Sequence, residues 1–203
     1  MKLHWIARRD VERQKAGPMP SGAVFLDRDG IINWRIVGDY VRSPEEFHFL
    51  PDIFPFLLGI RHLGLLAIVV TNQQGVAKGL MSLEQLQQVH DHMQQQLIRR
   101  IGSGVDDILV CTDPAESNSW YRKPQPGMLV EALRRWQLPP AACWMVGDSA
   151  TDILAGRRAG VRTIFVGHFP LPEADFCVLN LKEALEIIAT HQTAADVRQR
   201  LQH

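Results

Sequence analysis

The chain lacks a charge excess, a long apolar run and a recognisable leader. Lysine plus arginine and aspartate plus glutamate each total 22 of 203 residues, so no net field attracts nucleic acid or an anionic membrane surface. No stretch approaches the roughly 18 consecutive apolar residues of a membrane span. The first 20 residues are charged and lack the apolar centre of a signal peptide. We therefore expect a cytoplasmic protein with no nucleic-acid or membrane partner.

Cysteine is also scarce. Cys111, Cys143 and Cys177 are far apart, form no CxxC pair, and lie in or beside apolar stretches. This pattern is typical of buried free thiols in a reducing compartment.

What the chain does contain is a series of short apolar runs rich in branched residues. These runs are residues 23–26, 65–70, 108–111, 143–146, 163–166 and 176–179. Segments with helical signals lie between or after them, at residues 53–63, 82 to about 102, 127–136, 151–159 and 181 to about 190. This alternation predicts an α/β fold, a three-layer Rossmann-like open parallel sheet with helices on both faces.

The length and the 46% hydrophobic content are enough for a single core. We expect an arm or tail over residues 1–20, one domain over 21–190, and a helix end or tail over 191–203. Residues 31–49 are too irregular for a crossover helix. They are expected to form a short flap, a minimal cap after the first strand of the domain.

Polar side chains follow four of the predicted strands, at the end where open parallel sheets bind ligands. In chain order they are Asp27 and Asp29, Thr71 and Asn72, Lys123, and Asp148 followed by Asp152. Crowded carboxylates resist ionising unless a cation lies among them, and oxygen ligands favour magnesium, which also binds phosphate. A lysine and a hydroxyl can hold the oxygens of a transferring phosphoryl group. The set predicts a magnesium site that handles phosphate.

Each element alone has a simpler explanation. An Asp-x-Asp after a strand is often only a turn, Asp148 could cap the helix that follows, and a lone lysine is usually solvated. The order of all four elements at strand ends favours a functional site.

This order resembles the haloacid dehalogenase superfamily: DxD plus glycine, Thr or Ser after the second strand, a lysine, then GDxxxD. The resemblance covers about residues 23–180. It implies that Asp27 is a nucleophile forming an aspartyl phosphate, and that Asp29 is the general acid and base. It also implies that Thr71 and Lys123 hold the phosphoryl oxygens. The implied metal ligands are Asp27, the backbone carbonyl of Asp29, Asp148 and Asp152.

Within the superfamily the finer resemblance is to the histidinol phosphatases and heptose bisphosphate phosphatases, which lack a large cap. It is carried by GDYV at 38–41, VVTNQQGVAKG at 69–79 and RKPQPGM at 122–128. The group implies a magnesium-dependent, monomeric phosphatase of a small phosphorylated sugar. The first choice is a D-glycero-D-manno-heptose 1,7-bisphosphate losing its 7-phosphate in nucleotide-heptose and lipopolysaccharide precursor synthesis.

The same group implies four residues close to the substrate: Asn72, Gln73, Lys78 and Arg122. The planar guanidinium of Arg122 suits the second phosphate of a bisphosphate.

The third loop departs from the group, many of whose members bind a structural zinc there through Cys-x-His and Cys-x-Cys. Here Cys111 is kept, but Asp113, Ser119 and Tyr121 stand at the other three positions. One thiolate and one carboxylate cannot close a tetrahedral site, so we expect no structural zinc.

Other functions stay open. A histidinol-phosphate phosphatase, or another small-metabolite phosphatase, would share the catalytic set and differ in its pocket. A phosphoryl receiver also combines strand-end acids, threonine and lysine, but carries its phosphorylated aspartate after the third strand, where this chain has CTD at 111–113. A degenerate binding scaffold would be expected to lack a catalytic position, and none is missing.

Overall fold

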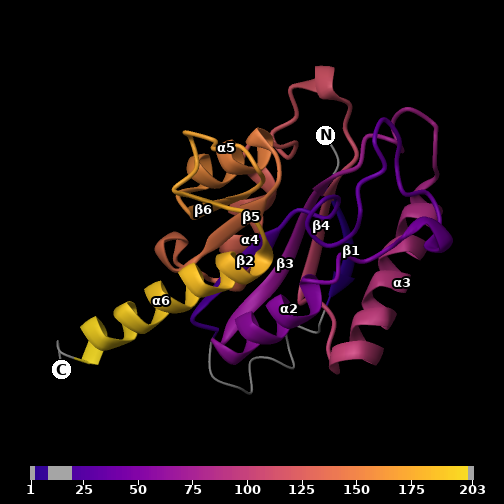
Figure 1. Cartoon of the computed structure of the whole chain (residues 1–203). Helices are drawn as coiled ribbons and strands as arrows, with labels where there is room; N and C mark the ends of the chain where they lie inside the picture. The colour runs from indigo at the N-terminus through magenta and orange to yellow at the C-terminus, as the bar shows by residue number, and fades with distance from the viewer. Residues whose placement is uncertain (1–2, 9–19, 201–203) are drawn as a thin grey trace.

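A seven-stranded sheet forms the centre of the computed structural model, which describes residues 3–8 and 20–200 and the side chains of 20–192 (Figure 1). Its strands are β1 (Leu3–Arg8), β2 (Gly22–Leu26), β3 (Leu65–Asn72), β4 (Asp107–Cys111), β5 (Trp144–Gly147), β6 (Arg162–Val166) and β7 (Phe176–Val178). They lie in the order β1-β4-β3-β2-β5-β6-β7. Strands β2 to β7 pair in parallel and β1 pairs antiparallel with β4, so the predicted parallel α/β sheet is confirmed.

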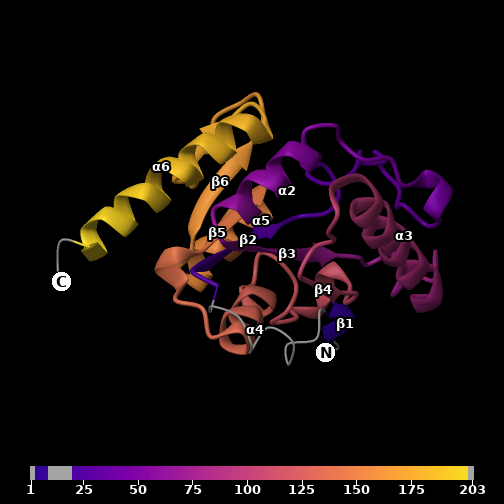
Figure 2. The same cartoon turned by 90° about the horizontal axis from the view of Figure 1, so that it is seen from below.

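Within the described residues, five α-helices cover the two faces of the sheet (Figure 2). They are α2 (Ile53–His62), α3 (Leu83–Ile101), α4 (Gly127–Trp136), α5 (Ala150–Ala159) and α6 (Leu181–Arg200). Side chains of α2, α3 and α6 share one buried cluster with the sheet, and those of α4 and α5 share a second. Successive β2 residues alternate between the clusters, because side chains along a strand point to opposite faces. This explains why the strand sequences are apolar throughout.

Helix α3 begins at a capping box formed by Ser82 and Gln85. The Ser82 hydroxyl accepts a hydrogen bond from the Gln85 backbone N–H at 3.1 Å, and the Gln85 side chain accepts one from the Ser82 N–H at 2.8 Å. The helix ends at Gly102, whose φ of 76° lies in the left-handed region.

Three sequence-based expectations need correction or extension. Residues 3–8 of the expected arm form strand β1, which covers the edge of β4, whereas 1–2 and 9–19 lie outside the described residues. Helix α6 continues ten residues past Thr190, to Arg200. Cys111 and Cys143 are buried, but Cys177 is exposed, because β7 is an edge strand with one open face.

The flap over residues 31–49 is irregular apart from one 3₁₀ turn, η1 (Pro44–Glu46). Its ends are joined by backbone hydrogen bonds from Trp34 to His48 and from Leu50 to Ile32, both 2.9 Å. Apolar side chains from both halves enter the core, while the tip around Val37 is 92% exposed. The flap is therefore anchored at its base and free at its tip.

In the part of the chain that the structure describes, none of the helices is long and apolar enough to cross a membrane.

Candidate active site

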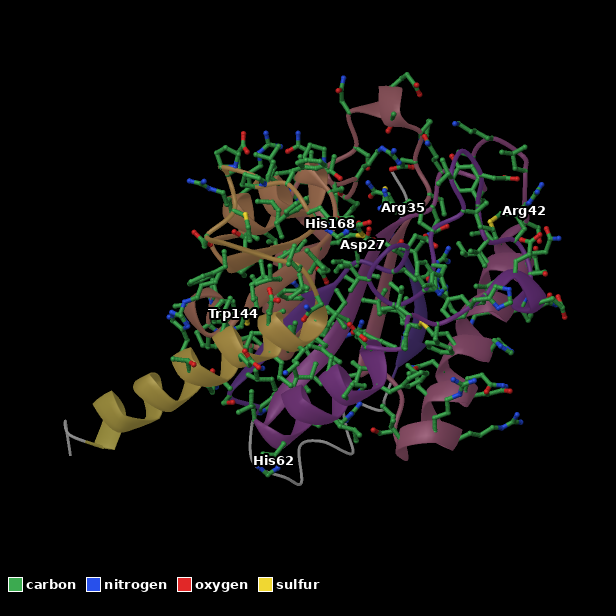
Figure 3. The ribbon with its side chains drawn as sticks, in the orientation of Figure 1. Asp27, Arg35, Arg42, His62, Trp144 and His168 are labelled. Atoms are coloured by element: carbon green, nitrogen blue, oxygen red, sulfur yellow. The ribbon has the colours of Figure 1, made fainter. Side chains whose placement is uncertain are left out.

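The site lies between β2 and β5, where the order in which strands are added to the sheet reverses direction. Strands β3 and β4 are added on one side of β2, and β5 to β7 on the other. The loops after β2 and β5 therefore open at a topological switch point, where α/β sheets bind ligands. Figure 3 shows Asp27 and Arg35 at this end of the sheet.

Gly30 allows the two acidic loops to approach each other. Its φ is +97°, and a Cβ at this position would lie 2.0 Å from Oδ2 of Asp148. Only glycine meets both conditions, so the residue after the DxD motif allows Asp148 of the loop after β5 to pack beside the loop after β2.

Lys123 is buried between two carboxylates. Its Nζ lies 2.8 Å from Oδ1 of Asp27 and 2.6 Å from Oδ1 of Asp152, and donates to the Val70 carbonyl at 2.8 Å. Burial alone would lower the pKa of this lysine, but the charges of Asp152 and Asp27 raise it above its ordinary value. Lys123 is therefore a fixed positive charge beside the proposed nucleophile.

Asn72 holds the loop that carries this lysine. Its side-chain amide donates to the Lys123 carbonyl at 3.0 Å and accepts from the Lys123 N–H at 3.1 Å. One side chain at the end of β3 thus fixes the backbone of Lys123.

Three carboxylates offer a site for a divalent cation. Asp27, Asp148 and Asp152 each present one oxygen, and these atoms lie within 4.8 Å of one another. Burial, then the nearby charge of Asp152, raise the pKa of Asp27 to about 7, and burial raises that of Asp148 to about 6. Three crowded carboxylates that resist ionising, and that offer oxygen atoms as ligands, fit magnesium.

The carboxylate of Asp29 is enclosed by donors. It accepts two hydrogen bonds from Arg28, at 2.9 and 3.0 Å, one from Asn33 at 2.9 Å and one from Gln73 at 2.8 Å. Burial would raise the pKa of Asp29, but the Arg28 charge and these hydrogen bonds hold it below its ordinary value. Asp29 is accordingly ionised in this arrangement. Arg28 in turn contacts buried His90 at 3.2 Å, so this histidine helps to hold the guanidinium that pairs with Asp29.

A cavity of about 390 Å³ opens over these groups. It is lined by Asp27, Asp29, Arg35, Ile36, Gly38, Asp39, Tyr40, Thr71, Asn72, Lys123, Ser149, Thr151 and Asp152. The predicted catalytic residues therefore meet at one wall, and the flap supplies the opposite one.

Of the four residues predicted to lie near the substrate, only Asn72 lines the cavity. Gln73 is fully buried behind it and donates to Asp29 and Thr71. Lys78 lies outside the cavity wall, with its Nζ 3.4 Å from the Tyr40 hydroxyl. Arg122 also lies outside the wall, and its guanidinium donates to the Asp113 carbonyl at 3.0 Å.

Several residues of the site were not predicted from the sequence. Arg35 and Tyr40 line the cavity from the irregular flap, where no periodic pattern marks which side chain points inward. Arg28 and Asn33 are near the DxD motif in sequence, and that proximity is the one signal that could have singled them out.

In the loop between β4 and α4, Cys111 and Ser119, which stand at two of the four zinc-ligand positions, still lie close together. The Cys111 sulfur lies 4.0 Å from the Ser119 hydroxyl, and burial raises the pKa of this thiol. Trp120 is 47% exposed and lies outside the cavity wall, while its carbonyl accepts from the Gly127 N–H at 3.0 Å. This tryptophan packs on the loop.

Comparison with known proteins agrees with this geometry. Residues 120–168 match the family model described as HAD-hydrolase-like. The chain is 35% identical to D-glycero-beta-D-manno-heptose-1,7-bisphosphate 7-phosphatase of Helicobacter pylori strain J99 over 169 residues, 82% of this chain and 96% of that protein. It is 41% identical to the D-glycero-alpha-D-manno-heptose enzyme of Mycobacterium bovis over 131 residues, 64% of this chain and 68% of that protein.

A solved structure shows the same architecture. The D,D-heptose 1,7-bisphosphate phosphatase from B. bronchiseptica, complexed with magnesium and phosphate, superposes with a TM-score of 0.75 at 29% identity. The match covers 84% of this chain and 99% of that one.

Proposed function

The chain belongs to the heptose-1,7-bisphosphate 7-phosphatase family of the haloacid dehalogenase-like hydrolases, and we propose that it removes the 7-phosphate of a D-glycero-D-manno-heptose 1,7-bisphosphate with magnesium. The observation that carries the proposal is the convergence of Asp27, Asp29, Thr71 and Lys123 on one cavity beside a three-carboxylate cation site. The products are heptose 1-phosphate and inorganic phosphate.

The first chemical step belongs to Asp27. The Lys123 ammonium and the Arg28 backbone N–H, both 2.8 Å from Oδ1, fix this carboxylate against the cavity. An Asp27 oxygen attacks phosphorus while the bond to the sugar oxygen breaks, giving an aspartyl phosphate. Bound magnesium would supply positive charge against the phosphoryl oxygens, and Lys123 and Thr71 supply charge and a hydroxyl there.

The proton transfers belong to Asp29. It protonates the departing sugar oxygen, then takes a proton from the water that attacks the aspartyl phosphate. The hydrogen bonds from Arg28, Asn33 and Gln73 favour the ionised form of Asp29, which is the form that accepts a proton from water in the second step. Before the first step this carboxylate must take up a proton from solvent through the open cavity.

A substrate panel tests the function. We expect kcat/KM for a heptose 1,7-bisphosphate to exceed that for fructose 1,6-bisphosphate and histidinol phosphate by at least about tenfold, which corresponds to one or two discriminating contacts. Both anomers belong in the panel, because the relatives include enzymes named for each. A preference for histidinol phosphate would replace the proposal with the alternative phosphatase.

Two further points complete the proposal. The free thiols suit a reducing cytoplasm. We also propose that the protein is a monomer, which light scattering of the purified protein would test.

A further inference from the structure

Arg35 occupies the same oxygens that the proposed magnesium would need. Its Nη2 donates to Oδ1 of Asp148 at 2.7 Å and to the backbone carbonyl of Asp29 at 3.0 Å, and lies 3.9 Å from Oδ2 of Asp27. Its Nε donates to the same Asp29 carbonyl at 3.3 Å. Figure 3 shows Arg35 close to Asp27, reaching from the flap to the end of the sheet.

The net negative charge of the carboxylate cluster explains why a cationic group, here the Arg35 guanidinium, is held beside it. With Asp27, Asp148 and Asp152 ionised, Lys123 leaves two negative charges uncompensated, and Arg35 reduces these to one. A divalent cation in place of Arg35 would neutralise the cluster. Because magnesium binds its oxygens at about 2.0–2.1 Å, those lone pairs cannot also accept hydrogen bonds from a guanidinium.

The displaced guanidinium has a nearby position to occupy. Arg35 lines the cavity, and its side chain is 46% exposed. A side chain that is half exposed at the cavity surface can change rotamer without displacing the core. Once magnesium has neutralised the cluster, Arg35 adds a positive charge that favours an anion, and a guanidinium can bind phosphate with two hydrogen bonds.

We propose that Arg35 and the divalent cation compete for one set of oxygens, and that the cation turns Arg35 into the cavity, where it binds a phosphate group of the substrate. The competition between Arg35 and the cation is argued only from the contacts of Arg35 with Asp148, the Asp29 carbonyl and Asp27. The phosphate contact rests on the proposed function, since it requires a phosphorylated substrate in this cavity.

The test uses Arg35→Gln with Arg42→Gln as a matched control. Arg42 is also a flap arginine, but it pairs with Asp39 at 2.8 Å and points away from Asp27 (Figure 3). Calorimetric titration of the whole protein with MgCl2, without phosphate, should show affinity for Mg²⁺ rising about two- to fivefold in Arg35→Gln, the range of one half-exposed charge contact. Arg42→Gln should match the wild type. Unchanged or weaker Mg²⁺ binding in Arg35→Gln, or an equal gain in both variants, overturns the competition.

The second arm measures inorganic phosphate binding at saturating Mg²⁺. Arg35→Gln should bind phosphate about tenfold more weakly, as expected for loss of a charge-assisted hydrogen-bonding group. Unchanged phosphate affinity overturns the substrate contact. Neither arm uses turnover, so a protein that fails on heptose bisphosphate but shows both shifts would contradict only the proposed function.

Discussion

For individual side chains at this site, the sequence predicted their presence better than their position and contacts. The resemblance to the haloacid dehalogenase superfamily implied that Asp27 is the nucleophile, and the structure adds that one of its oxygens is held by Lys123 and a backbone N–H. The same resemblance placed Gln73 near the substrate, whereas the structure buries this side chain and leaves it out of the cavity wall. The difference arises because sequence places a residue near a strand end, whereas the direction of its side chain depends on packing from elsewhere.

Replacing the nucleophile gives the most direct prediction. Asp27→Asn keeps the shape of the side chain but removes the attacking carboxylate, so phosphate release should fall by at least about 10³-fold. Phosphate release at saturating Mg²⁺ measures the effect, and a thermal melt checks the fold. Near-normal turnover would rule out the aspartyl-phosphate mechanism.

Gln73 separates positioning from substrate binding. Its amide orients both Asp29 and Thr71, at 2.8 and 2.9 Å, so Gln73→Ala should lower kcat by about tenfold with little change in KM. Steady-state kinetics gives both constants. A rise in KM at constant kcat would instead favour direct substrate contact.

At the scale of elements, strands were easier to predict than loops. The apolar runs at 65–70 and 108–111 predicted β3 and β4 because strands buried on both faces leave little choice of residue. Strand β1 was missed because LHWIAR is short and followed by charged residues, and its pairing depends on the distant edge of β4. The inward-facing Arg35 was missed for a similar reason, since flap geometry is set by contacts with the rest of the molecule.

The loop between β4 and α4 carries its own prediction. Since Asp113, Ser119 and Tyr121 replace three thiolate or imidazole ligands, we expect the protein to fold and act without zinc. Elemental analysis of the purified protein should find no stoichiometric zinc. One zinc per chain would contradict this account of the loop.

For the whole molecule, the buried acid cluster makes the free energy of unfolding depend on pH and on metal binding. The pKa of Asp27 rises from 3.8 to about 7 and that of Asp148 from 3.8 to about 6, so the folded metal-free protein holds these protons more tightly than the unfolded chain does. Their contribution to the free energy of unfolding is therefore present at low pH and lost as the pH rises from about 4 to 7. Over the same range the carboxylates become available to a cation.

The increase in Tm caused by Mg²⁺ should accordingly be larger at pH 7.5 than at pH 5.5, because at the lower pH protons occupy the ligands. Thermal melts in Mg²⁺ and in EDTA at both pH values measure it. Asp148→Asn, which removes one ligand, should reduce the increase at pH 7.5. An equal increase at the two pH values would contradict the link between these carboxyls and the metal.

The two hydrogen bonds between the Asn72 side chain and the Lys123 backbone also bear on how far the loop before this lysine can vary. Because the end of β3 holds the backbone of Lys123, the loop between Cys111 and Arg122 can differ in length and composition without displacing this lysine.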